Sequence, residues 1–452
     1  MKVFKKYLKD FTQNYNDTIK ISDDCNFEEI RELTTDSRKL AKNDLFIALK
    51  GENYNGNEYI NECIQKGASI CIGEVTSGNK LISIKNSEKF LEDFAKYILS
   101  LEKKIVVIGI TGTNGKTSTK EFANSIVSTK YKTHCTEGNL NNNLGLPITI
   151  LNMDESTEVL ILEMGTNNFG DIEKLADIAN PDIATITNIG KGHTLKLKNK
   201  DQIFSEKFNI TKNFSKKSTF IFNLDDPYLK KKYIDFNFNK KSFSINHNSD
   251  LRAIDISNDF RNFKIINQGK KINISLKAIG ISNIYNSLCA ASIASILNID
   301  SENIKVGLER FSGIKNRFRI LEYNNNNIVI NDTYNANPNS MLNALEMTNK
   351  IFPSKTKIAV LGDMLELGEI EKDEHEKLGS NLVKNGFDRV FIYGNNYDNY
   401  KRGISGRIEL EKINSHAEIA NYINLKEISD TVILVKGSRG SKMENILEYI
   451  GA

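Results

Sequence analysis

The fold is decided by one continuous stretch, Ile105-Val106-Val107-Ile108-Gly109-Ile110-Thr111-Gly112-Thr113-Asn114-Gly115-Lys116-Thr117-Ser118-Thr119. Its apolar first part predicts a buried strand, and residues 120–128 after it have helical character. A turn between a strand and a helix presents backbone N–H groups, backed by the helix N-terminus, to an anion. In such a turn Lys116 can reach the β- and γ-phosphates of a nucleotide, and the Thr117 hydroxyl can bind Mg²⁺. The stretch therefore predicts a phosphate-binding loop, or P-loop.

The spacing of this loop is a variant of the usual one. The strict pattern G-x-x-x-x-G-K-[ST] requires glycine at position 110, where this chain has Ile110, so that G-x-x-G-K-T remains. Glycine-containing turns are also common without a ligand. A strand, a turn, Lys-Thr and a helix in succession nevertheless favour a nucleotide site.

Two further apolar runs, residues 159–162 and 183–186, follow along the chain. Continuous apolar runs separated by helical segments predict a doubly wound, mostly parallel sheet, which binds ligands at the carboxyl ends of its strands. Glu163 and His193 come after these runs, where metal and phosphate chemistry is expected. A glutamate at this place can also be only a solvated strand end, and a single histidine is usually structural. We assign residues 103–316 to this central domain.

The residues before the central domain predict a small N-terminal α/β domain. Residues 1–102 combine short apolar strands, at 45–49 and 68–72, with polar turns and a helical pattern at 88–101. The charged segment Glu102-Lys103-Lys104 marks its end.

The residues after the central domain predict a C-terminal, Rossmann-like α/β domain at 317–452. Strand candidates at 357–361, 389–393 and 431–435 alternate there with helical stretches. The Asn-rich tract at 324–327 lies between two strand-like runs and is interpreted as a turn. Three domains agree with a length of 452 residues.

The amino-acid composition indicates whether the protein binds nucleic acid, inserts into a membrane or forms disulfides. The 61 Lys and Arg residues against 57 Asp and Glu are interspersed along the chain, so nucleic acid is not expected as a partner. No apolar run approaches the ~20 residues that span a bilayer, so we expect a soluble, cytoplasmic protein without membrane insertion. Five cysteines are scattered without a C-x-x-C pair, as expected for free thiols in a reducing compartment: Cys25, Cys63, Cys71, Cys135 and Cys289.

Residues 111–117 resemble the P-loop of the Mur ligases, the amide-forming enzymes of peptidoglycan precursor synthesis, whose broader superfamily includes folylpolyglutamate synthetases. Further segments resemble the type of Mur ligase that joins D-Ala-D-Ala to UDP-N-acetylmuramoyl-tripeptide: Asp36-Ser37-Arg38, Gly138-Asn139-Leu140-Asn141-Asn142, residues 331–338, residues 361–368, and Lys436-Gly437-Ser438-Arg439. The segment Tyr334-Asn335-Ala336-Asn337-Pro338 is the most discriminating. The type that adds lysine or diaminopimelate carries another signature, which is not found.

The resemblance implies an ATP-dependent acid–amino-acid ligase that uses ATP and Mg²⁺ and passes through an acyl phosphate. Its partners would be UDP-N-acetylmuramoyl-tripeptide and D-Ala-D-Ala, and we expect a monomer. The N-terminal domain would bind the UDP substrate, the central domain ATP, and the C-terminal domain the incoming dipeptide.

The resemblance also implies roles for individual residues. Catalytic roles fall to Lys116, Lys207 and His193, where Lys207 matches the lysine that related ligases carbamylate. The implied metal ligands are Thr117, Glu163, His193 and Lys207. The implied nucleotide contacts are Gly112, Thr113, Asn114, Gly115, Lys116, Thr117 and Ser118 at the phosphates, Asn283 and Asn286 at adenine, and Arg317 and Asp332 near phosphates and ribose. The implied substrate contacts are Ser37 and Arg38 at the uridine diphosphate, Asn139 and Asn142 at the sugar-peptide, and Tyr334, Asn335 and Asn337 at the dipeptide.

Three segments depart from the family pattern. Asn55-Gly56-Asn57 replaces the usual Asp-Gly-His, Ser282 replaces a histidine, and Lys191-Gly192-His193 is followed by a Lys-rich segment that lacks the usual Gly-Ser. None of them changes Lys116, Thr117, Glu163, His193 or Lys207.

Three other functions compete with this one. A P-loop GTPase switch needs an Asn-Lys-x-Asp motif, whereas the nearest string, Asn199-Lys200-Asp201, has the wrong spacing. A non-catalytic nucleotide-binding relative would be expected to have lost Lys116 or Glu163. Another amide ligase of the superfamily, with a different amino-acid acceptor, would differ only in its substrate.

Overall fold

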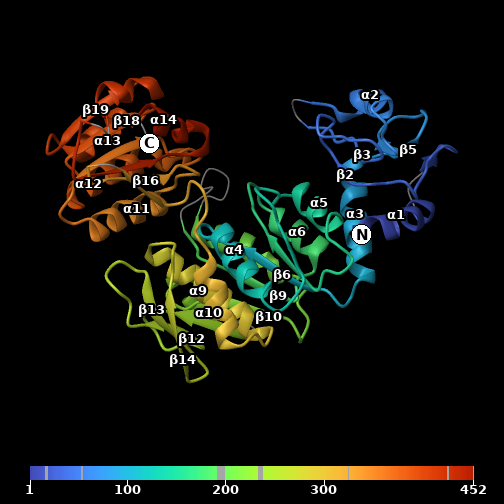
Figure 1. Cartoon of the computed structure of the whole chain (residues 1–452), viewed down its shortest axis with the longest axis horizontal. Helices are drawn as coiled ribbons and strands as arrows, with labels where there is room; N and C mark the ends of the chain where they lie inside the picture. The colour runs from blue at the N-terminus through green and yellow to red at the C-terminus, as the bar shows by residue number, and fades with distance from the viewer. Residues whose placement is uncertain are drawn as a thin grey trace.

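The computed structural model describes residues 1–15, 19–51, 54–190, 199–232, 238–323, 325–424 and 427–450. Three sheets follow one another along the chain, and the first and third lie on opposite sides of the second (Figure 1). The predicted α/β class with three sheet-containing regions is confirmed.

The first sheet has the order β1-β5-β4-β3-β2, with β1 antiparallel to β5 and the other pairs parallel. Its strands are short: β1 (Lys20–Ile21), β2 (Leu33–Thr34), β3 (Leu45–Ile47), β4 (Ile70–Gly73) and β5 (Leu81–Ser83). Helix α2 (Ile60–Gln65) packs on one side of the sheet through Ile60 and Cys63, against Phe46 and Cys71.

Two helices join this sheet to the central domain: α1 (Val3–Asn14) and α3 (Ser87–Leu101). The ring of Phe11 in α1 stacks on Phe94 of α3 with centroids 4.8 Å apart, and the backbone N–H of Val3 donates to the carbonyl of Met153 in the central domain. Helix α3 packs on α5 (Gly145–Leu151) and α6 (Asp171–Ala179). One hydrophobic cluster therefore continues from the first sheet into the central domain. The domain boundary at residue 102 stays a prediction.

The central sheet has the order β14-β13-β12-β11-β10-β9-β6-β8-β7. Pairs from β7 to β12 are parallel, and only β12–β13 and β13–β14 are antiparallel within this sheet as described. Its strands are β6 (Val106–Thr111), β7 (Thr133–Cys135), β8 (Val159–Glu163), β9 (Ile183–Ile186), β10 (Thr219–Asn223), β11 (Asn239–Ser244), β12 (Leu251–Ile254), β13 (Asn262–Asn267) and β14 (Lys270–Ser275).

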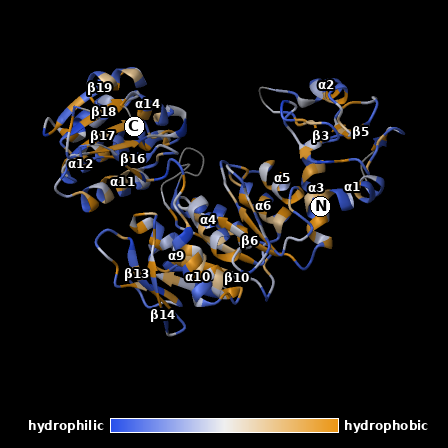
Figure 2. Ribbon diagram, in the orientation of Figure 1, coloured by the Kyte–Doolittle hydropathy of each residue, from blue (hydrophilic) through white to orange (hydrophobic). Residues whose placement is uncertain are grey.

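Helices cover both faces of the central sheet, as expected for a doubly wound fold. One face carries α4 (Lys116–Val127), α9 (Ile281–Ile296) and α10 (Ser301–Arg310), and the other carries α5 and α6. The chain also forms α7 (Lys200–Phe208) and α8 (Pro227–Lys232). Strands β6, β8 and β9 are almost entirely buried and mainly apolar, as expected for strands that are covered on both faces; β6 is largely orange in Figure 2.

The C-terminal sheet has the order β15-β16-β20-β17-β18-β19, with only β15–β16 antiparallel among its described pairs. Its strands are β15 (Arg319–Tyr323), β16 (Asn327–Asp332), β17 (Thr356–Gly362), β18 (Arg389–Tyr393), β19 (Glu409–Ile413) and β20 (Thr431–Lys436). One face packs on α11 (Pro338–Ile351), α12 (Glu371–Lys384) and α13 (Tyr397–Ile404), and the other on α14 (Ile446–Tyr449). The predicted Asn-rich turn is confirmed at Asn325 and Asn326, which both have a φ of 59°. No described helix is long and apolar enough to cross a membrane.

Candidate active site

The P-loop lies between β6 and α4, at the carboxyl end of β6. Residues that follow β9 hold it in shape. The N–H groups of Thr113 and Asn114 donate to the backbone carbonyl and the side-chain Oδ1 of Asn188, at 3.1 and 3.0 Å. The Thr187 hydroxyl and the Asn188 amide both donate to the carbonyl oxygen of Asn114. The residues that follow β9 therefore hold the loop in its conformation without the help of a ligand.

Two glycines of the loop have conformations that favour glycine. Gly112 has a φ of 147°, and a Cβ there would lie 1.9 Å from Oγ1 of Thr187. Gly115 has a φ of 82°, and a Cβ there would lie 2.5 Å from Oδ1 of Asn286 in α9. Position 115 therefore needs glycine both for its backbone and for the close approach of Asn286.

Replacing Gly115 with alanine is expected to destabilise the protein by about 1–2 kcal/mol from backbone strain alone and to weaken nucleotide binding as the loop shifts away from Asn286. Gly269→Ala is the matched control, because Gly269 also has a positive φ, 78°, whereas a Cβ at that position would meet no neighbouring atom within 4 Å. Chemical denaturation and ADP titration measure the two effects. If both variants bound ADP as the wild type does, the steric role of Gly115 would be refuted.

Lys116 and Thr117 start α4 at the mouth of the loop. The ammonium group of Lys116 donates to the carbonyl of Gly112 at 2.9 Å, and burial lowers its pKa. The hydroxyl of Thr117 accepts a 2.9 Å hydrogen bond from Arg317, which comes from the segment before β15. The guanidinium of Arg317 lies 4.0 Å from the ring centroid of Tyr334. Two cations and a hydroxyl therefore converge where phosphates are expected.

Glu163 ends β8 beside the P-loop strand, as predicted, and is 2% exposed. Its Oε1 accepts a 2.8 Å hydrogen bond from Asn141, while its buried Oε2 has no hydrogen-bond partner. A buried carboxylate oxygen without a donor is costly unless a cation compensates it. Hard oxygen donors, here Glu163 and Thr117, are the ligands that Mg²⁺ prefers, so these residues fit that ion. No group of three His, Cys, Asp or Glu residues that could hold a metal occurs in the described part of the chain.

Lys207 lies near the end of α7 and is 2% exposed. Burial, together with the charge of Lys116, lowers the pKa of Lys207 to about 7. The neighbouring Glu206 accepts from the backbone N–H groups of Gly170 and Ile172 and so anchors α7 to the start of α6. His193 lies outside the described residues.

The two predicted adenine contacts lie at the start of α9. Asn286 is mostly buried, and its Oδ1 accepts a 3.2 Å hydrogen bond from Thr119 in α4. Asn283 donates to the carbonyl of Ile279 at 2.8 Å. Asn286 thus also supports the P-loop helix, a role that sequence reasoning missed.

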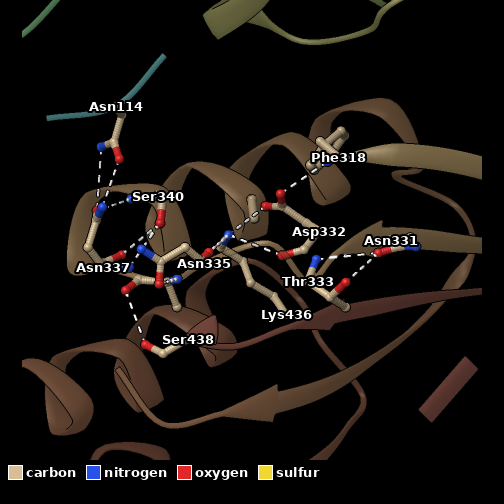
Figure 3. Close-up of polar contacts among 12 residues, drawn as sticks. Asn114, Phe318, Asn331, Asp332, Thr333, Asn335, Asn337, Ser340, Lys436 and Ser438 are labelled. Carbon is tan, nitrogen blue, oxygen red and sulfur yellow. Dashed lines mark hydrogen bonds and ion pairs between the residues drawn. The ribbon is translucent and has the colours of Figure 1, made fainter. Parts of the chain in front are cut away.

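The C-terminal domain contributes the segment between β16 and α11 (Figure 3). The carboxylate of Asp332 forms a 2.7 Å ion pair with the buried Lys436, at the end of β20, and accepts from the N–H of Phe318. Lys436 also donates to the carbonyl of Asn335 at 2.8 Å. Asn337 is the N-cap of α11. The polar segment is therefore rigidly attached to its own sheet.

A cavity of about 480 Å³ brings the two domains' residues together. The predicted residues that line it are Thr113, Asn114, Gly115, Lys116, Thr117, Ser118, Asn142, Glu163, Asn283, Asn286, Arg317, Asp332, Tyr334, Asn335 and Asn337. Lining residues without a predicted role include Asn141, Thr166, Asn167, Asp171, Lys436 and Arg439. The sequence carried a signal for three of these residues. Asn141 belongs to the segment Gly138-Asn139-Leu140-Asn141-Asn142, and Lys436 and Arg439 belong to the segment Lys436-Gly437-Ser438-Arg439.

Of the predicted residues that the structure describes, five do not line this cavity. Gly112 is a buried residue of the loop, Asn139 is exposed, and Lys207 is buried near Lys116. Ser37 and Arg38 belong to the N-terminal domain. The guanidinium of Arg38 donates to both oxygens of the Asp36 carboxylate, at 2.8 Å each, and thereby lowers the pKa of Asp36 to about 2. Their predicted contact with uridine diphosphate stays a prediction.

Comparison with known proteins covers most of the chain. Residues 29–98 match the catalytic domain of the Mur ligase family, residues 110–294 the Mur ligase middle domain, and residues 316–439 the Mur ligase glutamate ligase domain. The chain is 32% identical to the UDP-N-acetylmuramoyl-tripeptide–D-alanyl-D-alanine ligase of Bacillus subtilis, covering 93% of both chains. It is 35% identical to that of Buchnera aphidicola subsp. Baizongia pistaciae, over 93% of this chain and 92% of the relative.

Solved structures agree with the sequence relatives. MurF from Acinetobacter baumannii superimposes with a TM-score of 0.88 at 27% identity, covering 99% of this chain and 98% of the other. MurF ligase from Thermotoga maritima in complex with ADP gives 0.81 at 28% identity, covering 93% and 97%. The sequence matches, the shared three-sheet fold and the P-loop geometry lead to one conclusion: the chain belongs to the Mur ligase family.

Proposed function

We propose that this chain is an ATP-dependent ligase that joins D-Ala-D-Ala to UDP-N-acetylmuramoyl-tripeptide, giving the UDP-linked pentapeptide, ADP and phosphate. The observation that carries the proposal is the shared cavity, in which the P-loop faces the Tyr334–Asn337 segment of the C-terminal domain. The relatives at 32% and 35% identity carry the name of this activity. Both ATP and UDP-linked precursors are cytoplasmic metabolites, so we place the reaction in the cytoplasm, with the chain acting as a monomer.

The chemistry follows from the poor leaving group of a carboxylate. A carboxylate oxygen of the tripeptide attacks the γ-phosphorus of ATP, the bond to the bridging oxygen breaks, and ADP leaves with the electron pair. The free amine of D-Ala-D-Ala then attacks the carbonyl carbon of the acyl phosphate, phosphate leaves, and the amine loses a proton. Lys116 and Arg317, which both line the cavity, would neutralise negative charge that develops on the phosphates.

The residues around Glu163 suit a magnesium ion. Glu163 Oε2 and the Thr117 hydroxyl would hold it, with His193 and a modified Lys207 as further candidate ligands. When bound, Mg²⁺ would neutralise charge on the β- and γ-phosphates.

Lys207 is the candidate for carbamylation. A lysine with a pKa near 7 has a large neutral fraction at physiological pH, and the neutral amine is the form that adds CO₂. The product is an anionic oxygen ligand in place of a cation, which a second Mg²⁺ would accept. The loss of a positive charge beside Lys116 also relieves repulsion between two buried cations.

Substrates divide among the domains in this proposal. Ser37 and Arg38 with the segment around Asn55 hold the uridine diphosphate, and Asn139 and Asn142 contact the sugar-peptide. Tyr334, Asn335 and Asn337 would face the dipeptide. Closure of the C-terminal domain over the central one excludes water, which would hydrolyse the acyl phosphate.

Incubation with ATP, Mg²⁺, UDP-muramoyl-tripeptide and D-Ala-D-Ala is expected to give the pentapeptide, detected by mass, with one phosphate released per product. Single D- and L-amino acids, including glutamate, lysine and diaminopimelate, serve as comparison acceptors. Product with one of these and none with D-Ala-D-Ala would make the chain a different amide ligase of the superfamily. Phosphate release without any ligated product would argue against a ligase.

A further inference from the structure

Helix α11 of the C-terminal domain touches the central domain at several points. At its start, the side chain of Asn337 meets that of Asn114 in the P-loop. Further along, Met347 packs in the hydrophobic cluster of the central domain, near Gly280. Near its end, the ammonium group of Lys350 lies 4.5 Å from the ring centroid of Phe260. The helix thus lies along the central domain, with its polar contact at the active-site end.

The polar contact is a pair of side-chain amides (Figure 3). Nδ2 of Asn337 donates to Oδ1 of Asn114 at 2.7 Å, and Nδ2 of Asn114 donates to Oδ1 of Asn337 at 3.4 Å. Each amide therefore both donates and accepts, which asparagine and glutamine can do and which carboxylates or ammonium groups cannot.

Other groups hold the backbone of Asn114 and the side chain of Asn337. The carbonyl oxygen of Asn114 accepts from Thr187 and Asn188, so the residue cannot swing freely with the loop. Oδ1 of Asn337 also accepts from the N–H of Ser340 at 2.9 Å, while the hydroxyl of Ser340 accepts from the N–H of Asn337. The backbone of Asn114 and the side chain of Asn337 are therefore already ordered when the pair forms, which lowers the entropy cost of forming it.

The segment before Asn337 is equally fixed. Lys436 binds both the carboxylate of Asp332 and the carbonyl of Asn335, and Ser438 donates to the carbonyl of Ala336. A displacement of Asn337 therefore moves this whole segment relative to the P-loop.

We propose that Asn114 and Asn337 form an interdomain clasp that sets the position of the C-terminal domain on the nucleotide-loaded P-loop, and hence the position of the dipeptide. This inference rests on the proposed function and adds a role for the two asparagines as positioning residues. Asn114 acts through its side chain on the other domain, while its backbone belongs to the phosphate-binding loop. Because the clasp bridges the two sites, it links occupation of the nucleotide site to affinity for the dipeptide.

Three variants test the clasp: Asn114→Ala, Asn337→Ser and the double variant. Serine is a good N-cap and can accept from the N–H of Ser340, but it is too short to reach Asn114, so α11 keeps its start. Asn86→Ser is the matched control, because Asn86 caps α3 in the same way, through a 2.7 Å bond from the N–H of Lys89, and lies away from the cavity.

Each single variant is expected to raise the KM for D-Ala-D-Ala about tenfold, the loss expected from a preorganised hydrogen-bonded pair. The double variant is expected to be no worse than the poorer single one, because the pair is already broken. Asn337→Ser should keep the wild-type dissociation constant for ADP, and Asn86→Ser should match the wild type throughout. A general loss of stability would not raise the KM for D-Ala-D-Ala while leaving the dissociation constant for ADP unchanged.

A second measurement does not depend on the substrates. In small-angle X-ray scattering with Mg²⁺ and a non-hydrolysable ATP analogue, both single variants should have a larger radius of gyration than the wild type and Asn86→Ser. Kinetic effects that multiply in the double variant, or variants that scatter as the wild type does, would overturn the clasp. If the wild type formed no pentapeptide while the scattering differed as expected, the proposed function would fail and the clasp would stand.

Discussion

Lys116→Ala is expected to lower kcat for ligation by about a hundredfold to a thousandfold, because a partly buried cation that would face the developing phosphate charge is lost. Lys116 starts α4 and lies on the cavity side of the loop, where its ammonium group now bonds to the loop's own carbonyls. Lys116→Arg should also be strongly impaired, since the guanidinium is larger and planar. Phosphate release with saturating substrates measures the effect.

The exposed Lys270, on the β13–β14 hairpin, supplies the control Lys270→Ala. Melting temperatures should show that the Lys116 variants remain folded. Retained ATP turnover in Lys116→Ala would remove the P-loop from the mechanism and with it the site proposed for the phosphates.

Lys207→Ala is expected to lower activity about a hundredfold, and short carboxylic acids such as acetate or formate are expected to restore part of it. The acid would supply the oxygen ligand that the carbamate provides, in the space left by the side chain. Conservative replacement by arginine should abolish activity without rescue, because it keeps the charge and fills the space.

A spectroscopic measurement accompanies the assay. Wild-type protein kept in ¹³C-bicarbonate should show a carbamate carbonyl resonance by NMR that Lys207→Ala lacks. Full activity of Lys207→Ala without added acids would refute the carbamate, as would the absence of the resonance from active wild-type protein.

The parallel middle of the central sheet was predictable because β6, β8 and β9 are mainly apolar and buried. The run predicted at 105–110 forms β6 at Val106–Thr111, and the one predicted at 183–186 forms β9 at the same residues. The antiparallel pair β13–β14 was not predicted, because one face of it is solvated and its apolar residues alternate with lysine and asparagine. The strands of the first sheet are only two to four residues long, too short for a clear period.

The site was predictable where one local motif carries it. The P-loop and Glu163 follow directly from strands that end at the same edge of a sheet. The pairing of Asp332 with Lys436, and of Asn114 with Asn337, joins residues more than 100 positions apart. No local pattern reports such contacts: the register of β16 on β20 brings Asp332 to Lys436, and the packing of α11 on the central domain brings Asn337 to Asn114.

The shared core of the first and central domains has a consequence for synthesis of the chain. Helix α1 packs on α3, and α3 packs on α5 and α6, the second of which ends at residue 179. As the chain leaves the ribosome, the apolar face that includes Phe4, Phe11 and Phe94 has no complete partner until those helices have emerged. Exposed apolar surface of this kind promotes aggregation of nascent chains. The N-terminal part can therefore finish folding only after roughly eighty further residues have been synthesised. The C-terminal domain has hydrophobic clusters of its own and does not depend on α5 and α6 in this way.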